Sequence, residues 1–340
     1  MKAAIYHSPL NITTESVDKP TIGPEGILIR VRACGICGSD LHMYKLGLFT
    51  PQLCRQSDGG QIPGHEFSGD IVEVGDQVQN LAVGDRVVAY AMGGMAEYVP
   101  VTPAWPGGNV YKIPDSVSYK TAATLEPLAN SVHAVMKGSP GKDETAIVFG
   151  AGIIGLGVVQ CLKALDLGIK MVIAVDVSDK RLEMARTLGA DDTINAATDN
   201  VLEKALDIAG SVPMAMMPGI SMPAVDIAYD CVGLIKDRPE PPVLQQAINI
   251  VRPQTGRVVV HGVFEAPVTL EMSAFVGKQI RIIGSFGATP EGTLRAIELL
   301  ETKAVDREII ISHEFPLDQA KEAFDTQVNV ETSVKVVINP

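Results

Sequence analysis

The stretch "TAIVFGAGIIGLGVVQCLKAL", residues 145–165, decides the fold of this chain. Its first part is an apolar run of strand length, and its second part has the pattern of an amphipathic helix. Between them stand Gly150, Gly152 and Gly155. The first permits a tight turn, the second lets the backbone approach a pyrophosphate, and the third lets helix and strand pack closely. The stretch therefore predicts a strand, a turn and a helix that bind a dinucleotide by its phosphates.

The next strand-like run, "KMVIAVD", indicates which dinucleotide is bound. It ends in Asp176, 21 residues after the third glycine. A carboxylate there accepts hydrogen bonds from the adenosine ribose and repels a 2′-phosphate, which favours NAD over NADP. Lys180 and Arg181 follow closely and weaken that preference. Arg181 is also expected to contact the cofactor, as are two residues that open the helix, Ile153 and Ile154.

The pattern of strand-like and helix-like segments differs between the two parts of the chain. From about residue 145, strand-like runs alternate with helix-length segments, which predicts a doubly wound parallel sheet and an α/β fold. Residues 1–110 instead carry turn residues every eight to twelve positions, which predicts a β-rich, barrel-like unit. A Met- and Pro-rich stretch, residues 209–225, is interpreted as a loop between the third and fourth strands of the parallel sheet. The six expected strands are "TAIVFG", "MVIAVD", "DTIN", "VDIAYDCVG", "RVVVHG" and "IRIIGS".

Length, charge and cysteine content exclude several classes of protein. A chain of 340 residues is long enough for two domains. The net charge of −12 and the pI near 5.0 argue against nucleic acid as a partner, because a phosphate backbone needs a basic face. The apolar runs are too short to span a membrane, and no secretion signal is expected at the start of the chain. Five cysteines are an odd and sparse set, which predicts a cytoplasmic protein.

A second informative stretch is "ACGICGSDLHMY", residues 33–44. A structural zinc ribbon would need a second Cys/His pair, and none of the other cysteines belongs to one. A thiol redox pair would need a strand-to-helix turn of an α/β unit, whereas this pair lies in the β-rich region. Both interpretations are therefore disfavoured. An open metal site needs one cysteine and ligands from elsewhere, and His65, Glu66 and Glu126 are candidates. Such a set suits Zn²⁺ with one position left for water or substrate, and a bound alcohol there would lose its proton more readily.

Several motifs, in order along nearly the whole chain, carry a resemblance. They are "GICGSDLHMY", "GHEFSGDIVEVG", "GDRV", "AEYV", "LEPLANSVHA", "GAGIIG" and "VKVVINP". The chain resembles a zinc-containing medium-chain dehydrogenase/reductase, close to the branch of the sorbitol, butanediol and threonine dehydrogenases. The resemblance implies a GroES-like catalytic domain, residues 1–127 and 286–340, and a Rossmann NAD-binding domain, residues 128–285.

The resemblance also implies the ligands of the metal. Cys37, His65 and Glu66 would ligate a catalytic zinc, and Glu126 would either ligate it directly or hold the zinc-bound water. Relatives often carry a second, structural zinc in a lobe with four closely spaced cysteines after "GDRV". Here "GDRVVAYAMGGMAEYV" runs on without a cysteine, so one zinc per chain is expected.

A proton relay is implied in the same way. Ser39 would take the alcohol proton and pass it through the cofactor ribose to His42 and solvent. Asp40 would orient the ring of His65 from behind. Lys335 matches a basic position that lies near the cofactor phosphates or near Asp40.

The expected activity is hydride transfer between NAD and a secondary alcohol, a polyol or vicinal diol, to give the ketone. A small-molecule alcohol is the expected partner, with no nucleic acid or membrane, and the resemblance implies a homodimer or homotetramer. Two other interpretations stay open. One is a zinc-free quinone or enoyl reductase of the same superfamily, and the other is a non-catalytic NAD-binding regulatory protein.

Overall fold

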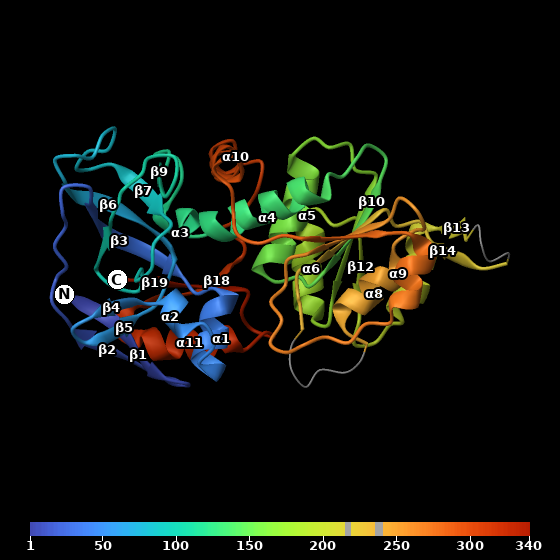
Figure 1. Ribbon diagram of the computed structural model, residues 1–340, viewed down its shortest axis with the longest axis horizontal. Helices are drawn as coiled ribbons and strands as arrows, with labels where there is room; N and C mark the ends of the chain where they lie inside the picture. Colours follow the sequence, from blue (N-terminus) through green and yellow to red (C-terminus); the bar gives the residue numbers. More distant parts are fainter. Residues whose placement is uncertain (215–218, 235–240) are drawn as a thin grey trace. The chain divides into compact units, whose positions relative to one another are not determined.

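The computed structural model describes residues 1–214, 219–234 and 241–340 (Figure 1). The chain divides into two compact units, Met1–Pro127 with Ala296–Pro340, and Leu128–Arg295. The first division falls at the boundary expected from the sequence, and the second falls ten residues beyond residue 285, inside a helix. Two helices carry the chain across these divisions, α4 (Leu125–Gly138) and α10 (Pro290–Glu301).

The unit of Leu128–Arg295 contains a six-stranded sheet in which every pair of neighbours is parallel. Its order, β12-β11-β10-β15-β16-β17, confirms the predicted doubly wound sheet and each of its six strands. The central strands have almost no exposed residues, which explains their nearly continuous apolar sequence. The strands are β10 (Thr145–Phe149), β11 (Met171–Asp176), β12 (Asp192–Asn195), β15 (Ile227–Asp230), β16 (Arg257–Val260) and β17 (Arg281–Gly284).

Helices connect these strands and cover the sheet, as Figure 1 shows in green to orange. Side chains of α7, α8 and α9 share one apolar core with the strands, and α5 and α6 pack against β10 and β11. The helices are α5 (Ile153–Ala164), α6 (Asp179–Thr187), α7 (Val201–Ala209), α8 (Val243–Ile250) and α9 (Met272–Lys278). The stretch 209–225 lies between the third and fourth strands as expected, and its described part forms a hairpin, β13 (Ser211–Pro213) and β14 (Ser221–Pro223).

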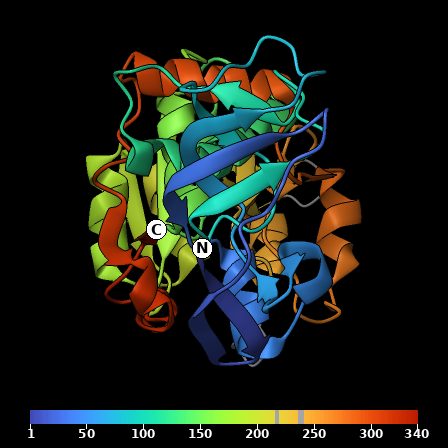
Figure 2. The ribbon, with the colours of Figure 1, turned by 90° about the vertical axis from the view of Figure 1, so that its left-hand side faces the viewer.

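The other unit is rich in β-structure (Figure 2). A seven-stranded sheet runs in the order β18-β19-β3-β6-β7-β9, with β8 paired to β3 as well, and a four-stranded sheet runs in the order β2-β1-β5-β4. Alternating side chains of these strands form one large apolar core that also includes α11. This unit is the β-rich unit that the sequence predicted, built on residues from both ends of the chain.

The elements of this unit have the following bounds. The strands are β1 (Lys2–Ser8), β2 (Asn11–Ser16), β3 (Ile27–Gly35), β4 (Arg55–Ser57), β5 (Gly60–Ile62), β6 (Glu66–Val74), β7 (Arg86–Ala89), β8 (Tyr98–Val101), β9 (Val110–Lys112), β18 (Ile311–Pro316) and β19 (Lys335–Asn339). The helices are α1 (Gly38–Leu46), α2 (Thr50–Leu53), α3 (Tyr119–Ala122), a 3-10 turn (Leu317–Gln319) and α11 (Ala320–Val328). Among the described residues, no helix combines the length and the apolar character that crossing a bilayer requires.

Candidate active site

Three of the predicted metal ligands meet in the β-rich unit. One ligand atom each of Cys37, His65 and Glu66 lies within 4.8 Å of the other two. The register of the sheet explains the meeting, because Gly35 at the end of β3 pairs with Glu66 at the start of β6. Cys37 follows β3 as the N-cap of α1. Two segments that are far apart in sequence therefore deliver a thiol, an imidazole and a carboxylate to one point.

Two glycines make room for this cluster. Gly64 has a φ of +96°, a backbone conformation that other residues rarely adopt, and a Cβ there would lie 2.8 Å from Cys34 Sγ. Gly35 faces the Glu66 carboxylate and the Lys335 side chain so closely that a Cβ would collide with both. The Gly-flanked "GHE" turn is thus required by close packing behind the ligands.

Burial and mutual charge shift the pKa values of the titratable groups in this cluster. Burial and then Glu66 raise the pKa of the Cys37 thiol. Burial alone would lower the pKa of His65, but Asp40 and Cys37 outweigh it and hold that pKa well above its usual range. Burial also raises the pKa of Asp40. A cation among these groups would favour the thiolate and the carboxylates, as metal binding does.

The donor set fits zinc. Glu66 is fully buried, and its Oε1 has no hydrogen-bond partner among the described residues, an arrangement that a native structure rarely tolerates. Atoms within 4.8 Å of one another can surround a single ion, since Zn²⁺ ligands lie about 2.0–2.3 Å from the metal. Thiolate, imidazole and carboxylate are together a donor set that zinc prefers.

The other oxygen of Glu66 is held by a lysine. Lys335 Nζ donates to Glu66 Oε2 and, at 2.7 Å, to the carbonyl oxygen of Ile36. Both side chains of this ion pair have no exposed surface. Its charge also acts on Asp40, one of the two surroundings expected for this lysine, and the other expectation, a place near the cofactor phosphates, stays a prediction.

Asp40 and Glu126 flank the cluster. Asp40 is buried, its Oδ2 accepts a hydrogen bond from the Cys37 backbone N–H at 2.9 Å, and its Oδ1 lies 3.7 Å from His65 Nδ1. The last distance suits an ion pair and is too long for a hydrogen bond. Glu126, the second residue of α4, is close enough to influence the pKa of both Cys37 and His65, although it lies outside the tight group of three.

The two expected relay residues share a helix. Ser39 and His42 lie three positions apart on α1, so their side chains point from the same face, and both are half-buried. The helix begins at the metal cluster, because its N-cap is Cys37. Cys34, the other cysteine of the motif, is fully buried and lies outside the group of three.

The glycine-rich turn has the geometry that its sequence predicts. Gly150 follows β10 with a φ of +89°, and Gly152 is the N-cap of α5. A Cβ at Gly155 would overlap the carbonyl oxygen of Gly150, whereas a Cβ at Gly152 would meet only Arg181 Nη1, at 3.9 Å. Gly155 therefore serves packing, and Gly152 leaves open space at the start of α5, where Ile153 and Ile154 follow.

Asp176 stands at the end of β11, beside this turn. Its Oδ2 accepts a hydrogen bond from Ala151 N at 2.7 Å, and its Oδ1 accepts one from Val177 N at 2.8 Å and one from Ser178 N at 3.0 Å. The carboxylate is thus held at the carboxyl edge of the sheet, the edge at which doubly wound folds bind their ligands.

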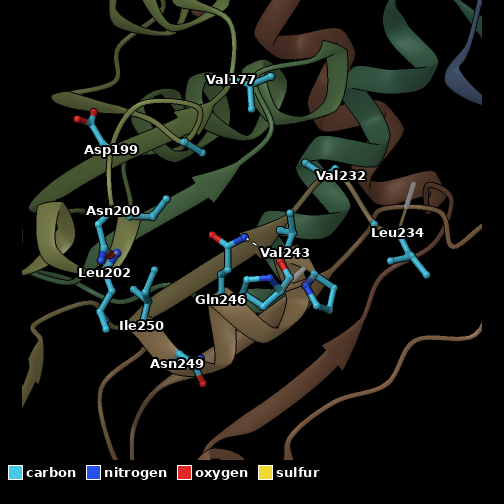
Figure 3. A pocket seen from close by; sticks show the side chains of 15 residues that line it. Val177, Asp199, Asn200, Leu202, Val232, Leu234, Val243, Gln246, Asn249 and Ile250 are labelled. Carbon is cyan, nitrogen blue, oxygen red and sulfur yellow. Dashed lines mark hydrogen bonds between the residues drawn. The ribbon is translucent and has the colours of Figure 1, made fainter. Parts of the chain in front are cut away.

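A cavity of about 450 Å³ opens at the same edge (Figure 3). Val177 and Ala196, which follow β11 and β12, line it together with Val232 beyond β15. Two polar residues that the sequence did not single out, Asn200 and Gln246, also line it, and Figure 3 shows the hydrogen bond from Gln246 Nε2 to Pro241 O, at 3.1 Å. The only sequence signal for them is their place in the segments that follow the strands. The cavity has the size and the place of a nucleoside pocket.

Comparison with known proteins assigns the family. Residues 23–115 match the family described as "Alcohol dehydrogenase GroES-like domain", and residues 154–302 match "Zinc-binding dehydrogenase". The chain is 31% identical to an erythritol/L-threitol dehydrogenase of Mycolicibacterium smegmatis, a match that covers 100% of this chain and 98% of that one. It belongs to the zinc-type medium-chain alcohol dehydrogenase family.

Two further relatives of this dehydrogenase carry different substrate names. An L-idonate 5-dehydrogenase of Vitis vinifera is 29% identical, over 94% of this chain and 89% of that one. The crystal structure of 2R,3R-butanediol dehydrogenase from Bacillus subtilis matches with a TM-score of 0.81 and 29% identity, covering 100% of this chain and 99% of that one. The dehydrogenase is thus a zinc-type oxidoreductase that acts on CH–OH groups with a nicotinamide dinucleotide. The zinc-free reductase and the non-catalytic protein are not favoured.

Proposed function

We propose that the dehydrogenase oxidises a secondary alcohol of a polyol or vicinal diol to the ketone, with transfer of a hydride to NAD. The observation that carries the proposal is the group of Cys37, His65 and Glu66, which combines a zinc-type donor set with a buried carboxylate oxygen that has no partner among the described residues. When bound there, zinc would act as a Lewis acid and favour loss of the alcohol proton. The polyol class is supported by the substrate names of the relatives.

The residues around the cluster have separate roles in this proposal. Ser39 accepts the alcohol proton and His42 passes it to solvent, which is supported by their common face on α1. Asp40 orients His65, because its carboxylate stands at ion-pair distance from the imidazole. Lys335 balances the charge of Glu66 at Oε2, on the side away from Oε1, for which the described residues provide no partner. Glu126 completes the site, either as a ligand or by holding water.

NAD is the proposed form of the dinucleotide. Asp176 sits at the end of β11 with its carboxylate fixed by three backbone N–H groups, so a 2′-phosphate beside it would meet a fixed negative charge. Arg181 stands near the turn at Gly152, where it can contact a phosphate of the cofactor. When bound there, NAD would supply its nicotinamide ring as the hydride acceptor.

We also propose a homodimer or homotetramer in the cytoplasm. β17 is an edge strand of the six-stranded sheet, and three apolar side chains on or near it are exposed: Ile282 (37%), Phe286 (94%) and Val276 (67%). An exposed strand edge with apolar neighbours is a surface suited to pairing with a second copy. The cytoplasmic location rests on the odd and sparse set of cysteines.

The test is NADH formation from a panel of polyols, vicinal diols and simple secondary alcohols, with native and with chelator-treated protein. Turnover that chelation abolishes and zinc restores supports the proposal. Cys37→Ser should lose zinc and turnover together, while the matched control Cys34→Ser should keep its zinc, since Cys34 lies outside the group of three. Equal zinc content in both variants would remove Cys37 from the site.

A further inference from the structure

His261 is a titratable residue of the nucleotide unit to which neither the metal cluster nor the glycine-rich turn assigns a role. It directly follows β16, and its backbone N–H donates to the carbonyl oxygen of Asp230, the last residue of β15, at 2.9 Å. The imidazole is half-buried, and its Nδ1 lies 3.2 Å from Oγ of Ser285, which directly follows β17. An imidazole and a hydroxyl are thus paired at the carboxyl edge of the sheet, where doubly wound folds bind their ligands.

The serine determines which ring nitrogen of His261 carries the proton. Ser285 is 7% exposed, and among the described residues its hydroxyl has no hydrogen-bond partner except His261. A buried O–H without an acceptor is costly, so this hydroxyl donates to Nδ1. Burial, and then His133, lower the pKa of His261 to about 4, so the ring is neutral near pH 7. A neutral imidazole carries one proton, which therefore sits on Nε2.

The Nε2–H group is a donor that a ligand can reach. It makes no hydrogen bond to any residue that the structure describes. Nε2 is also not among the buried polar atoms that lack a partner, so it is open to the surroundings of the protein. A ring that is fixed at Nδ1 and open at Nε2 is suited to donate to an oxygen atom of a bound molecule.

Close backbone contacts connect this ring with the glycine-rich turn. A Cβ at Gly150, in the turn, would lie 2.6 Å from Cγ2 of Val232, a residue beyond β15 that lines the nucleoside cavity (Figure 3). Gly233 follows, and a Cβ at Gly262 would lie 2.0 Å from its backbone nitrogen. His261 directly precedes Gly262. The segments after β10, β15 and β16 therefore lie side by side along one edge.

The order of the strands places His261 on the nicotinamide side of this edge. Neighbours in the sheet run β11-β10-β15-β16-β17, so Asp176 on β11 and His261 after β16 stand on opposite sides of β10 and its turn. A dinucleotide whose phosphates lie at that turn has one nucleoside on each side of it. With the adenosine beside Asp176, the nicotinamide lies over the ends of β15, β16 and β17, where His261 and Ser285 stand.

We propose that His261 Nε2 donates a hydrogen bond to the carboxamide oxygen of the nicotinamide and thereby fixes the rotation of the ring. The carboxamide is the only substituent of this ring that offers an oxygen acceptor. A ring held there cannot turn over about its bond to the ribose, so C4, which takes the hydride, keeps one face toward the alcohol. The inference concerns the dinucleotide and does not depend on which alcohol is oxidised.

Calorimetric titrations of zinc-loaded enzyme with NADH and with ADP-ribose test this contact. ADP-ribose keeps the adenosine, both phosphates and the second ribose, and lacks only the nicotinamide. His261→Phe keeps a ring and removes the Nε2 donor. We expect NADH to bind about fivefold to 100-fold more weakly to this variant, the range for a carbonyl left without its donor, and ADP-ribose to bind within about twofold of the wild type. Equal losses for the two ligands, or no loss for NADH, would overturn the proposal.

Further variants separate the contact from a general role of the ring in packing. His261→Gln should restore part of the NADH affinity, because its amide offers an N–H donor. The matched control is His313→Phe, since His313 is a half-buried histidine of the β-rich unit whose Nδ1 lies 3.1 Å from Ser312 Oγ. It should bind NADH like the wild type. A loss of NADH affinity in His313→Phe as large as in His261→Phe refutes the assignment.

An analogue of the dinucleotide identifies the atom that is recognised. Thio-NADH replaces the carboxamide oxygen with sulfur, a weaker hydrogen-bond acceptor. The wild type should bind thio-NADH at least threefold more weakly than NADH, and this ratio should fall below about twofold in His261→Phe. The same ratio in both proteins would exclude the oxygen as the partner of His261. These measurements need no alcohol, so absence of turnover with every alcohol would refute the proposed oxidation alone.

Discussion

Replacement of Lys335 by Met should expose the energetic role of the buried pair with Glu66. The change keeps most of the side-chain volume and removes only the ammonium group. It leaves the Glu66 carboxylate buried beside Cys37, Asp40 and Glu126, with no lysine to balance it. The zinc-free protein should therefore lose stability more than the zinc-loaded protein, because a metal can replace the missing positive charge.

The size of the expected destabilisation follows from the burial of the ion pair. Both partners have no exposed surface, and removing one partner of such a pair costs about 3–5 kcal/mol. For a unit of this size each kcal/mol lowers Tm by about 2–4 °C, so the expected decrease is about 6–20 °C in zinc-free protein. Exposed ion pairs behave differently, since solvent screens them.

Thermal unfolding of chelated and zinc-loaded samples provides the measurement. Lys2→Met is the matched control, because Lys2 pairs with Asp318 at 2.7 Å while both side chains are more than half exposed. We expect no resolvable change in Tm for that variant. The reasoning is refuted if Lys335→Met melts within about 1 °C of the wild type, or if zinc fails to narrow the difference between them.

Three other predictions concern the nucleotide unit. Gly155→Ala should lower the free energy of unfolding by about 1–3 kcal/mol or more, because its Cβ would overlap the Gly150 carbonyl. Gly152→Ala should keep the free energy of unfolding of the wild type, because its Cβ meets open space, and should bind NADH at least tenfold more weakly in a fluorescence titration. Asp176→Ala should raise KM for NAD and reduce the NAD/NADP preference about tenfold; an unchanged ratio would contradict the role assigned to β11. Burial, and then His133, lower the pKa of His261 to about 4, below the usual 6.5, so its neutral form is the one that stabilises the fold. The neutral imidazole should contribute about 3 kcal/mol to the free energy of unfolding above pH 6.5, and this contribution should be lost as the pH falls toward 4. Urea titrations at several pH values should show a smaller decrease in the free energy of unfolding for His261→Phe.

The nucleotide unit could be predicted almost completely from the sequence. Its strands are buried on both faces and are therefore nearly continuous apolar runs, and its glycines mark a turn that only one arrangement of strand and helix requires. The order of the strands in the sheet was not predicted and comes from the structure. Local pattern and global fold agree here, which is why reasoning from short stretches succeeded.

The metal site could be predicted only as a set of residue types. The meeting of Cys37 with Glu66 depends on the register between β3 and β6, and the pairing of Lys335 with Glu66 joins residues 269 positions apart. Neither of these two contacts produces a periodic pattern of residue types in the sequence. The sequence does not single out His261 either, because its pairing with Ser285 joins the ends of two neighbouring strands.

The last strand has a consequence for how the enzyme matures. β19 pairs with β3 and places Lys335 beside ligands that are synthesised some 270 residues earlier. On the ribosome, the nucleotide unit is one continuous segment that can fold as soon as it emerges, whereas the catalytic unit must wait for the end of the chain. We therefore expect zinc to enter after translation is complete. A tag or truncation that disturbs β19 should yield protein that still binds dinucleotide but is purified with little metal.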